Sequence, residues 1–205
     1  MLANKPYVIG LTGGIGCGKS EAAKYLESLG AVRFDADEVS RALTAPGGEA
    51  LPAIREQFGD GVFNADGTLD RAALARIVFS SAPQRRALEA ILHPLVQREM
   101  MKCLDAAGEA GERVVILDVP LLFETGMDAL CDETWTLYLD REMQISRIAV
   151  RDGLSREDAE ARIDSQMPAD ERIARATRAI NTDQPIERTR AELEQLYRAA
   201  VKRAG

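Results

Sequence analysis

The chain has 205 residues and a formal net charge of -7, with 46% hydrophobic and 29% charged residues. This length suits one domain with one sizeable core, and the composition is that of an ordinary globular protein. The acidic balance argues against a non-specific nucleic-acid binder, which needs a basic surface. The N-terminal stretch shows no signal-peptide pattern, and no apolar run reaches the roughly 18 residues of a membrane helix. We therefore expect a cytoplasmic protein that binds neither nucleic acid nor membrane.

The cysteines and the histidine exclude several kinds of site. Cys17, Cys103 and Cys131 lie far apart and form no C-x-x-C pair, so they predict neither a disulfide framework nor a zinc site. Free thiols fit a reducing compartment. His93 is the single histidine, which excludes a His-rich metal centre.

The N-terminal part predicts a strand, a glycine-rich loop, a helix and a second strand. The apolar run 7–11 is typical of a buried strand, and the loop LTGGIGCGKSE follows it directly. Helical spacing of apolar residues continues to Leu29, and Gly30 is expected to cap that helix. A second short run, 31–34, predicts the next strand. The order favours an α/β fold with a mainly parallel sheet.

The glycine-rich loop matches a phosphate-binding motif. Residues 13–20, GGIGCGKS, satisfy G-x-x-x-x-G-K-[ST] between a strand and a helix, as this motif requires. Its backbone N–H groups and the helix N-terminus would bind phosphate oxygens, Lys19 would reach the β- and γ-phosphates, and the Ser20 hydroxyl would bind Mg²⁺. The alternative is a fortuitous glycine-rich turn. The expected nucleotide-binding residues of the loop are Gly14, Ile15, Gly16, Cys17, Gly18, Lys19 and Ser20.

Two aspartates, Asp35 and Asp37, follow the second predicted strand. Because that strand ends beside the loop of the first, they are expected at the edge of the sheet where α/β proteins bind ligands. A carboxylate there can accept the proton of an attacking hydroxyl. A carboxylate before EVSRAL can equally cap a helix. Both interpretations remain open for the two residues.

Residues 38–108 show helical patterns and no strand pattern. The turn-rich stretches TAPGGEALP and FNADGTLD separate short helices, and Pro94 predicts a kink or a helix boundary near His93. A segment of this length exceeds an ordinary strand-to-helix connection, so we interpret it as an inserted helical subdomain.

The runs 114–117 and 134–139 predict two further strands. Asp118 ends the first of them, where many proteins with this loop keep an acid that organises Mg²⁺; a turn-forming aspartate is the alternative.

Beyond the fourth strand the pattern predicts two helices joined at Gly153, and Ser155 with Asp158 resembles a capping box. Arg147 and Arg151, four residues apart, share one helical face. Arginines on a mobile lid can stabilise a transferring phosphoryl group, but they can also form a solvated face paired with Glu142 or Asp152. An amphipathic helix is expected to end the chain.

A GTPase is a weak alternative, because the chain has no N-K-x-D motif. Its D-x-x-G match, at 105–108, follows a helical segment rather than a strand.

Taken in order, IGLTGGIGCGKS, FDADEVSRAL, DGTLDRAALARIVF, LEAILHPLV, DVPLLFETG and R-x-x-x-R-D-G followed by Gln166 resemble the dephospho-CoA kinase family. The resemblance runs from residue 7 to about residue 184. It implies transfer of the γ-phosphate of ATP to the ribose 3'-hydroxyl of dephospho-CoA, with Mg²⁺ as cofactor. It also implies a single P-loop kinase domain with a core of residues 1–40, 109–140 and 167–205, a helical acceptor-binding insertion at 41–108 and a lid at 141–166.

The resemblance also implies roles for individual residues. Asp37 becomes the preferred general base, with Asp35 as second choice, and Lys19, Arg147 and Arg151 act on the phosphates. Arg41 and His93 would lie along the acceptor cleft, and Ile180 and Thr182 would line the adenine. From its place at the end of a strand, Asp118 is expected to contact metal and substrate. The stretch AINTDQP departs from the Asn and Gly that the family tends to have at the adenine.

Two other functions are alternatives: a kinase for another nucleoside or small alcohol, and a nucleotide-dependent regulatory switch. The insertion beside an acidic strand end favours a kinase, since a switch needs no acceptor cleft. We expect a monomer or a weak homo-oligomer.

Overall fold

The computed structural model describes residues 5–205; residues 1–4, which begin the N-terminal stretch in which we expect no signal peptide, lie outside them. The described chain forms two compact units. One comprises residues 5–34 and Leu104–Gly205, and the other is Asp35–Cys103.

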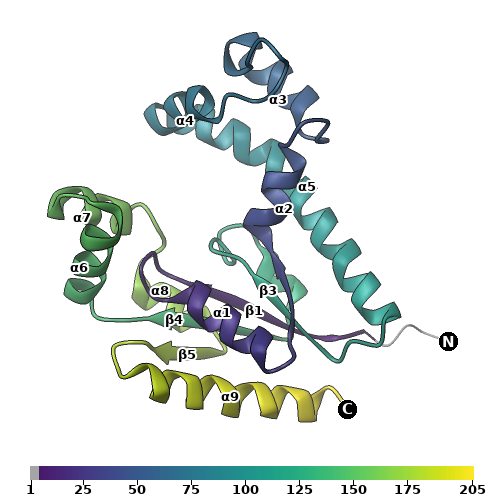
Figure 1. Cartoon of the computed structure of the whole chain (residues 1–205), viewed down its shortest axis with the longest axis vertical. Coiled ribbons are helices and arrows are strands. Elements are labelled where there is room, and N and C mark those ends of the chain that lie inside the picture. Colours follow the sequence, from purple (N-terminus) through teal and green to yellow (C-terminus); the bar gives the residue numbers. More distant parts are fainter. Residues whose placement is uncertain (1–4) are drawn as a thin grey trace. The chain divides into compact units, whose positions relative to one another are not determined.

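The first unit is built on a sheet (Figure 1). Within residues 5–205 its five strands are β1 (Tyr7–Gly13), β2 (Val32–Asp35), β3 (Val114–Asp118), β4 (Glu133–Tyr138) and β5 (Arg178–Asn181). They lie in the order β2-β3-β1-β4-β5. β1 pairs in parallel with β3 on one side and β4 on the other, and β4 pairs in parallel with β5. The predicted α/β fold is confirmed.

Four of these strands correspond to the predicted apolar runs, but the sequence analysis missed β5. Its burial pattern explains why: Ile180 is buried, whereas Arg178, Ala179 and Asn181 are exposed. A short edge strand with one buried side chain has no apolar run to reveal it.

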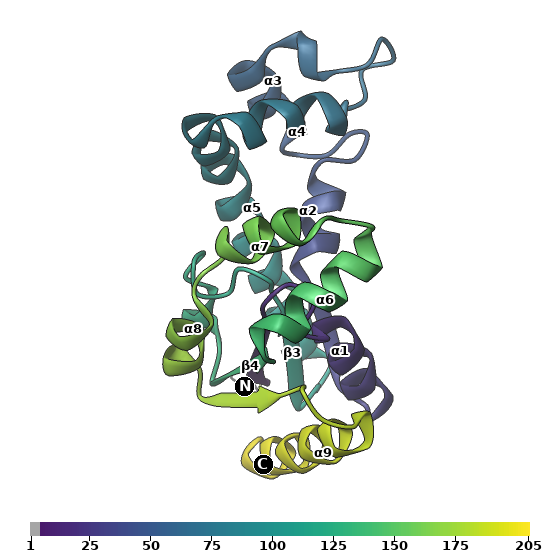
Figure 2. The same ribbon diagram turned by 90° about the vertical axis from the view of Figure 1, so that its left-hand side faces the viewer.

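Helices α1 (Lys19–Ser28) and α9 (Ile186–Arg203) contact each other and β1 (Figures 1 and 2). Leu26 from α1 and Leu193 from α9 are buried in one core cluster with Ile9 and Trp135 of the strands. The predicted end of α1 is confirmed, because Gly30 N–H donates to the Glu27 carbonyl (2.9 Å) and closes the last turn. The apolar stripes of these two helices therefore anchor the sheet and the loop that precedes α1.

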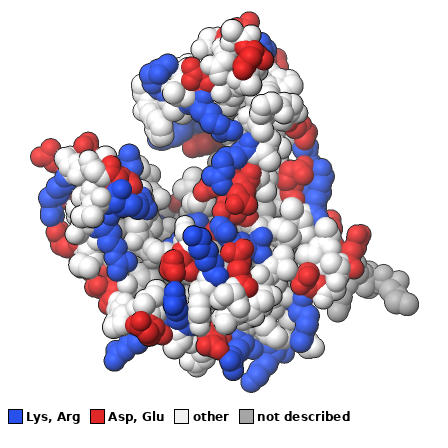
Figure 3. All heavy atoms as spheres, viewed as in Figure 1, with Lys and Arg blue, Asp and Glu red and all other residues white. Residues whose placement is uncertain are grey.

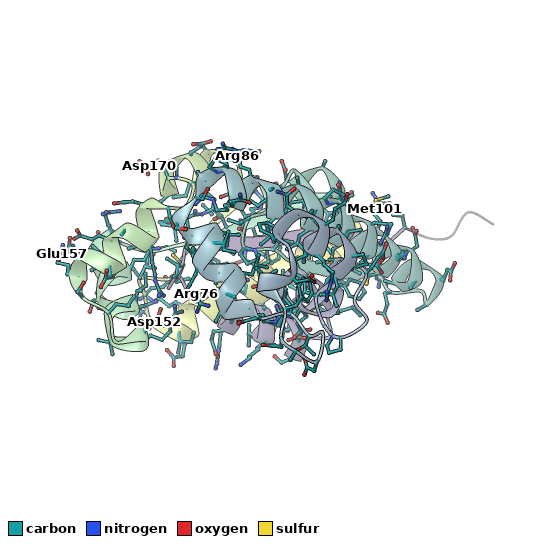
Figure 4. The ribbon with its side chains drawn as sticks, turned by 90° about the horizontal axis from the view of Figure 1, so that it is seen from above. Arg76, Arg86, Met101, Asp152, Glu157 and Asp170 are labelled. Carbon is teal, nitrogen blue, oxygen red and sulfur yellow. The ribbon has the colours of Figure 1, made fainter. Side chains whose placement is uncertain are left out.

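The segment after β4 forms α6 (Arg141–Asp152), α7 (Arg156–Asp164) and α8 (Ala169–Arg175), while η2 (Met127–Leu130) precedes β4. Gly153 ends α6 and the Ser155 hydroxyl accepts the Asp158 N–H (3.1 Å), so the predicted helix pair and cap are confirmed. Glu157 of α7 points outward (Figure 4).

The second unit is helical, as expected. It contains α2 (Ala36–Leu43), α3 (Leu51–Phe58), η1 (Asp60–Val62), α4 (Arg71–Ser80) and the greater part of α5 (Ala82–Glu109). Of the two alternatives predicted near His93, a kink or a helix boundary, the boundary is wrong, since α5 continues through Pro94. Proline removes one hydrogen bond of the ladder, but Val96 and Met100 beyond it are buried, and this packing favours continuation of the helix.

On the face shown in Figure 3, Lys and Arg are interspersed with Asp and Glu. No helix in the described range is both long enough and apolar enough to cross a membrane.

Candidate active site

The glycine-rich loop leaves β1 at the middle of the sheet. β1 lies between β3 and β4. The chain leaves β1 for β2 on one side of it, whereas the connection from β3 leads to β4 on the other side, and ligands of α/β proteins bind where the strand order reverses in this way. Gly18, the residue before α1, has a φ of 80°, which only glycine adopts readily. This turn directs the loop into the N-terminus of α1, whose free N–H groups attract anions.

Lys19, in the first turn of α1, is paired with Asp118, the last residue of β3. Its ammonium donates to Asp118 Oδ1, while Arg33 donates to Oδ2 through Nε (2.9 Å) and its terminal NH2 (2.8 Å). The Asp118 side chain is almost fully buried. Two cations therefore compensate the buried charge of one carboxylate beside the loop.

The front of the loop is held by residues from two distant parts of the chain. Gln166 Oε1 accepts the Ile15 N–H (2.8 Å), and Gln144 Nε2 donates to the Ile15 carbonyl (2.6 Å). A Cβ on Gly14 would stand 2.8 Å from both Gln144 Nε2 and the Arg172 NH2 group, so a larger residue would require the ends of these two side chains to move. The loop conformation thus depends on the α6–α8 segment as well as on its own glycines.

A cavity of ≈ 200 Å³ lies against the start of α1. It is lined by Gly18, Tyr25, Leu137, Arg147, Thr182, Gln184, Ile186 and Arg190, among others. Arg147 donates to the Thr182 carbonyl (3.3 Å), and the Thr182 hydroxyl donates to the Cys17 carbonyl (3.1 Å). Thr182 and Arg147 thus meet at this cavity beside the loop. Ile180, in contrast, is fully buried in the sheet core and does not line it.

Arg151 lies on the same helix as Arg147 but in a different environment. It donates to Asp152 through Nε (2.7 Å) and NH2 (3.0 Å), and 57% of its side-chain surface is exposed. The pairing with Asp152 that the sequence analysis kept as an alternative is present in this structure.

Four expected site residues belong to the second unit. Asp35 caps α2, because its carboxylate accepts the N–H groups of Asp37 (2.8 Å) and Glu38 (3.2 Å). Asp37 follows in the first turn of α2 and is exposed. Arg41 is exposed in the last turn of α2, and His93 is half-buried within α5. The capping interpretation therefore applies to Asp35.

Cys17, within the loop, is a neutral thiol. Burial raises its pKa, although the positive charges of Arg172 and Arg147 oppose the shift, so Cys17 stays protonated at neutral pH.

The residues present fit a magnesium ion held mainly by phosphate oxygens and water, which is how Mg²⁺ usually binds beside nucleotides. Ser20 is exposed at the start of α1, and the buried Asp118 carboxylate, at the end of the strand beside β1, is bonded to Lys19 and Arg33.

The sequence analysis assigned no role to Gln144, Gln166, Arg172 or Arg33. Gln144 lies on α6 and Gln166 in the bend after α7, and a single polar residue at either place carries no sequence signal for a partner elsewhere in the chain. The pairing of Arg33 with Asp118 depends on the neighbouring positions of β2 and β3.

The sheet order, with a P-loop leaving its central strand, defines a P-loop kinase fold, and solved structures support this class. A shikimate kinase from Acinetobacter baumannii aligns with a TM-score of 0.53 at 18% identity, covering 98% of this chain and 96% of its own, and shows the fold alone. The dephospho-CoA kinase family model matches residues 7–188, and the chain belongs to that family.

Individual relatives agree. The dephospho-CoA kinase of Symbiobacterium thermophilum is 46% identical over 193 residues, which span 94% of this chain and 81% of that protein. A crystal structure from Thermus thermophilus is similar with a TM-score of 0.80 and 35% identity, covering 95% of this chain and 97% of its own. The resemblance seen in the motifs is therefore confirmed.

Proposed function

We propose that the protein transfers the γ-phosphate of ATP to the ribose 3'-hydroxyl of dephospho-CoA, forming coenzyme A and ADP. The observation that carries the proposal is the P-loop at the N-terminus of α1 in a chain that the dephospho-CoA kinase family model matches over residues 7–188. ATP is the phosphate donor of a kinase of this family.

In this proposal the P-loop holds the phosphates of ATP. The free N–H groups at the start of α1 bind phosphate oxygens, and Lys19 adds a charged donor. Asp118 holds the Lys19 ammonium at the end of β3, next to the loop, before the phosphates arrive. The cavity beside Gly18 takes the nucleoside, because Tyr25, Leu137 and Ile186 supply apolar lining there and Thr182 and Gln184 supply polar groups.

Asp37 is our preferred general base. The 3'-oxygen forms a bond to the γ-phosphorus while the bond to the β–γ bridging oxygen breaks; the hydroxyl proton passes to the base, and the leaving electrons stay on ADP. Asp35 is second choice, because its carboxylate already accepts two N–H groups at the cap of α2, whereas Asp37 is exposed.

Arg147, Arg151 and Lys19 would stabilise the charge on the phosphoryl oxygens. The Ser20 hydroxyl would bind Mg²⁺ directly. Asp118 would act on Mg²⁺ without binding it directly, since Lys19 and Arg33 already bond both oxygens of the Asp118 carboxylate. A bound Mg²⁺ would neutralise charge between the β- and γ-phosphates.

The division of labour follows the predicted segments. In this proposal the predicted core segments, 1–40, 109–140 and 167–205, would hold ATP, 41–108 would bind the acceptor through Arg41 and His93, and 141–166 would act as a lid. The second unit, Asp35–Cys103, carries Arg41 and His93. In support of the lid, Gln144 and Gln166 bond the P-loop from both parts of that segment.

We propose that the protein works in the cytoplasm as a monomer or weak homo-oligomer. Cys17, Cys103 and Cys131 are free thiols in the structure, which fits a reducing compartment.

The decisive assay uses purified protein, Mg-ATP and dephospho-CoA, with mass spectrometry of the product. We expect one added phosphate, located on the ribose 3'-position, and loss of the product with Lys19→Ala. The matched control is Lys24→Ala, which removes an exposed lysine from the same helix. Phosphorylation of another small alcohol instead of dephospho-CoA would refute the proposal. ATP hydrolysis that no acceptor accelerates would favour a regulatory switch.

A further inference from the structure

Arg172 is a buried cation on α8 without an acidic partner in the described part of the chain. Its relative exposure is 5%. One terminal nitrogen, NH1, donates to the Met167 carbonyl (2.9 Å), whereas Nε makes no hydrogen bond. A buried arginine is ordinarily paired, as even the partly buried Arg33 is with Asp118, because desolvating an uncompensated charge is costly. The charge of Arg172 therefore needs an anion from outside the described part of the chain.

The guanidinium group lies against the P-loop. Its NH2 group would stand 2.8 Å from a Cβ on Gly14, and Gln144 Nε2 occupies the same side of that glycine. Its positive charge also lowers the pKa of Cys17, three residues further along the loop, against the effect of burial. Arg172 is thus close to both the front and the middle of the phosphate-binding turn.

The orientation of the side chain matches what a phosphate requires. Met167 accepts from NH1, the buried Nε has no acceptor within residues 5–205, and NH2, on the same edge as Nε, faces Gly14 of the loop. Two donors on one edge of a planar guanidinium can bind two oxygens of one phosphate. A cavity of ≈ 470 Å³, lined by Gln144, Gln166 and Arg172 among others, gives this region an opening.

We propose that Arg172 binds the terminal phosphate of ATP through Nε and NH2. In this proposal the phosphates extend from the N-terminus of α1 along the front of the loop. Gly14 has no side chain there, and the Arg172 guanidinium lies against it. The inference rests on the proposed use of ATP. The contact proposed for Arg172 differs from those of the lid arginines, because Arg151 is exposed and paired with Asp152, and Arg147 lies at the cavity beside Gly18.

The test compares two nucleotides that differ in the terminal phosphate. Calorimetry measures Mg²⁺ with β,γ-imido-ATP and Mg²⁺ with ADP on the wild type, Arg172→Met and Arg172→Lys. We expect Arg172→Met to weaken binding of β,γ-imido-ATP by about tenfold or more, as for one lost charge-assisted contact, and that of ADP by less than about twofold. Arg172→Lys keeps the charge but not the fork, and should fall in between.

Arg175→Met is the matched control. It removes an arginine from the same helix that contacts the Phe123 ring and Asp128 instead of the loop. The ratio of the two affinities should stay at the wild-type value. Equal weakening for both nucleotides in Arg172→Met, or no weakening, would overturn the proposal, since a structural role does not distinguish ATP from ADP.

If Arg172→Met does not fold, a second measurement, made on the wild-type protein, still tests the proposal. The Arg172 Nε–H resonance, assigned by its absence from the Arg172→Lys spectrum or by selective labelling, should shift on adding β,γ-imido-ATP with Mg²⁺ and not with ADP. A shift with both nucleotides, or with neither, contradicts the proposal. Neither measurement contains dephospho-CoA, so failure of acceptor phosphorylation remains a separate result that refutes only the proposed transfer.

Discussion

The ammonium of Lys19 and the buried carboxylate of Asp118 form an ion pair that joins the P-loop to the end of β3. Arg33, at the edge strand β2, binds the other carboxylate oxygen. One buried acid of β3 thus links β2 to the first turn of α1 and holds Lys19 next to the P-loop.

We expect Asp118→Ala to lower the free energy of unfolding by about 3 kcal/mol, because it removes the buried acid that the partly buried Lys19 and Arg33 share, although Arg33 keeps Glu27 at 3.6 Å. Urea unfolding followed by circular dichroism measures the change. Glu157→Ala, at an exposed acid on α7, is the control and should change stability by less than about 0.5 kcal/mol. A loss no larger than that of the control would mean that the pair does not stabilise the fold.

Asp35→Ala should mainly affect stability. The substitution removes the acceptor of two N–H groups at the start of α2, and N-cap losses cost about 1 kcal/mol. Thermal unfolding measures this, and Asp35→Ser, which keeps an oxygen that can cap the helix, should recover most of the loss. Failure of serine to restore stability would show that capping is not the role of this carboxylate.

Asp37→Asn should mainly affect turnover. Loss of a general base lowers kcat by roughly 10²- to 10⁴-fold, while the affinity for ATP stays near the wild-type value. Steady-state kinetics with dephospho-CoA, combined with calorimetry of Mg²⁺ and β,γ-imido-ATP, separate the two effects. Equal loss of turnover and ATP affinity would make Asp37 a structural residue.

Gln166→Ala should loosen the P-loop, because the Ile15 N–H loses its acceptor. Hydrogen exchange measured by mass spectrometry is expected to be faster in a peptide containing Ile15. Gln144→Ala is a matched control: it removes the donor to the Ile15 carbonyl but leaves the amide bonded to Gln166. If Ile15 exchanges at the wild-type rate in Gln166→Ala, this hydrogen bond does not restrain the loop.

We expect Glu133 to contribute to the free energy of unfolding in a way that depends on pH. Burial alone would raise its pKa, but hydrogen bonds from Trp135 and Tyr7, with the charges of Arg203 and Arg178, hold the pKa below its ordinary value of 4.5. Because the folded pKa is depressed, the contribution is present above the unfolded pKa and is lost as pH falls through the folded value.

Glu133→Gln should therefore lower the free energy of unfolding at pH 7, and the difference from wild type should shrink below about pH 4.3, the ordinary range of a glutamate. Denaturant unfolding over this pH range measures it, with Glu157→Gln as the exposed control. A difference that is constant with pH would contradict the assigned charge interaction.

Several elements could be predicted because their signals are local. The P-loop motif, the buried strands β1, β3 and β4 and the ends of α1 and α6 all depend on residues near one another in sequence. β5 could not, since it has one buried residue, and the continuation of α5 through Pro94 depends on burial beyond the proline.

The candidate site divides in the same way. Spacing alone indicated that Asp35 or Asp37 caps α2 or acts as a base, and the side-chain geometry assigned the cap to Asp35. The partners of Asp118 and Ile15 come from segments distant in sequence, so no window of sequence contains them together.

The sequence by itself determined that a loop for phosphates follows a buried strand, because glycines, a lysine and a serine at fixed spacing can be recognised without any tertiary contact. Its motifs also identified the family. Only the tertiary structure decided which charges meet: Lys19 and Arg33 share Asp118, and Arg172 is buried behind Gly14. The reason is physical, since the cost of burying a charge depends on what surrounds it, and folding brings those surroundings together.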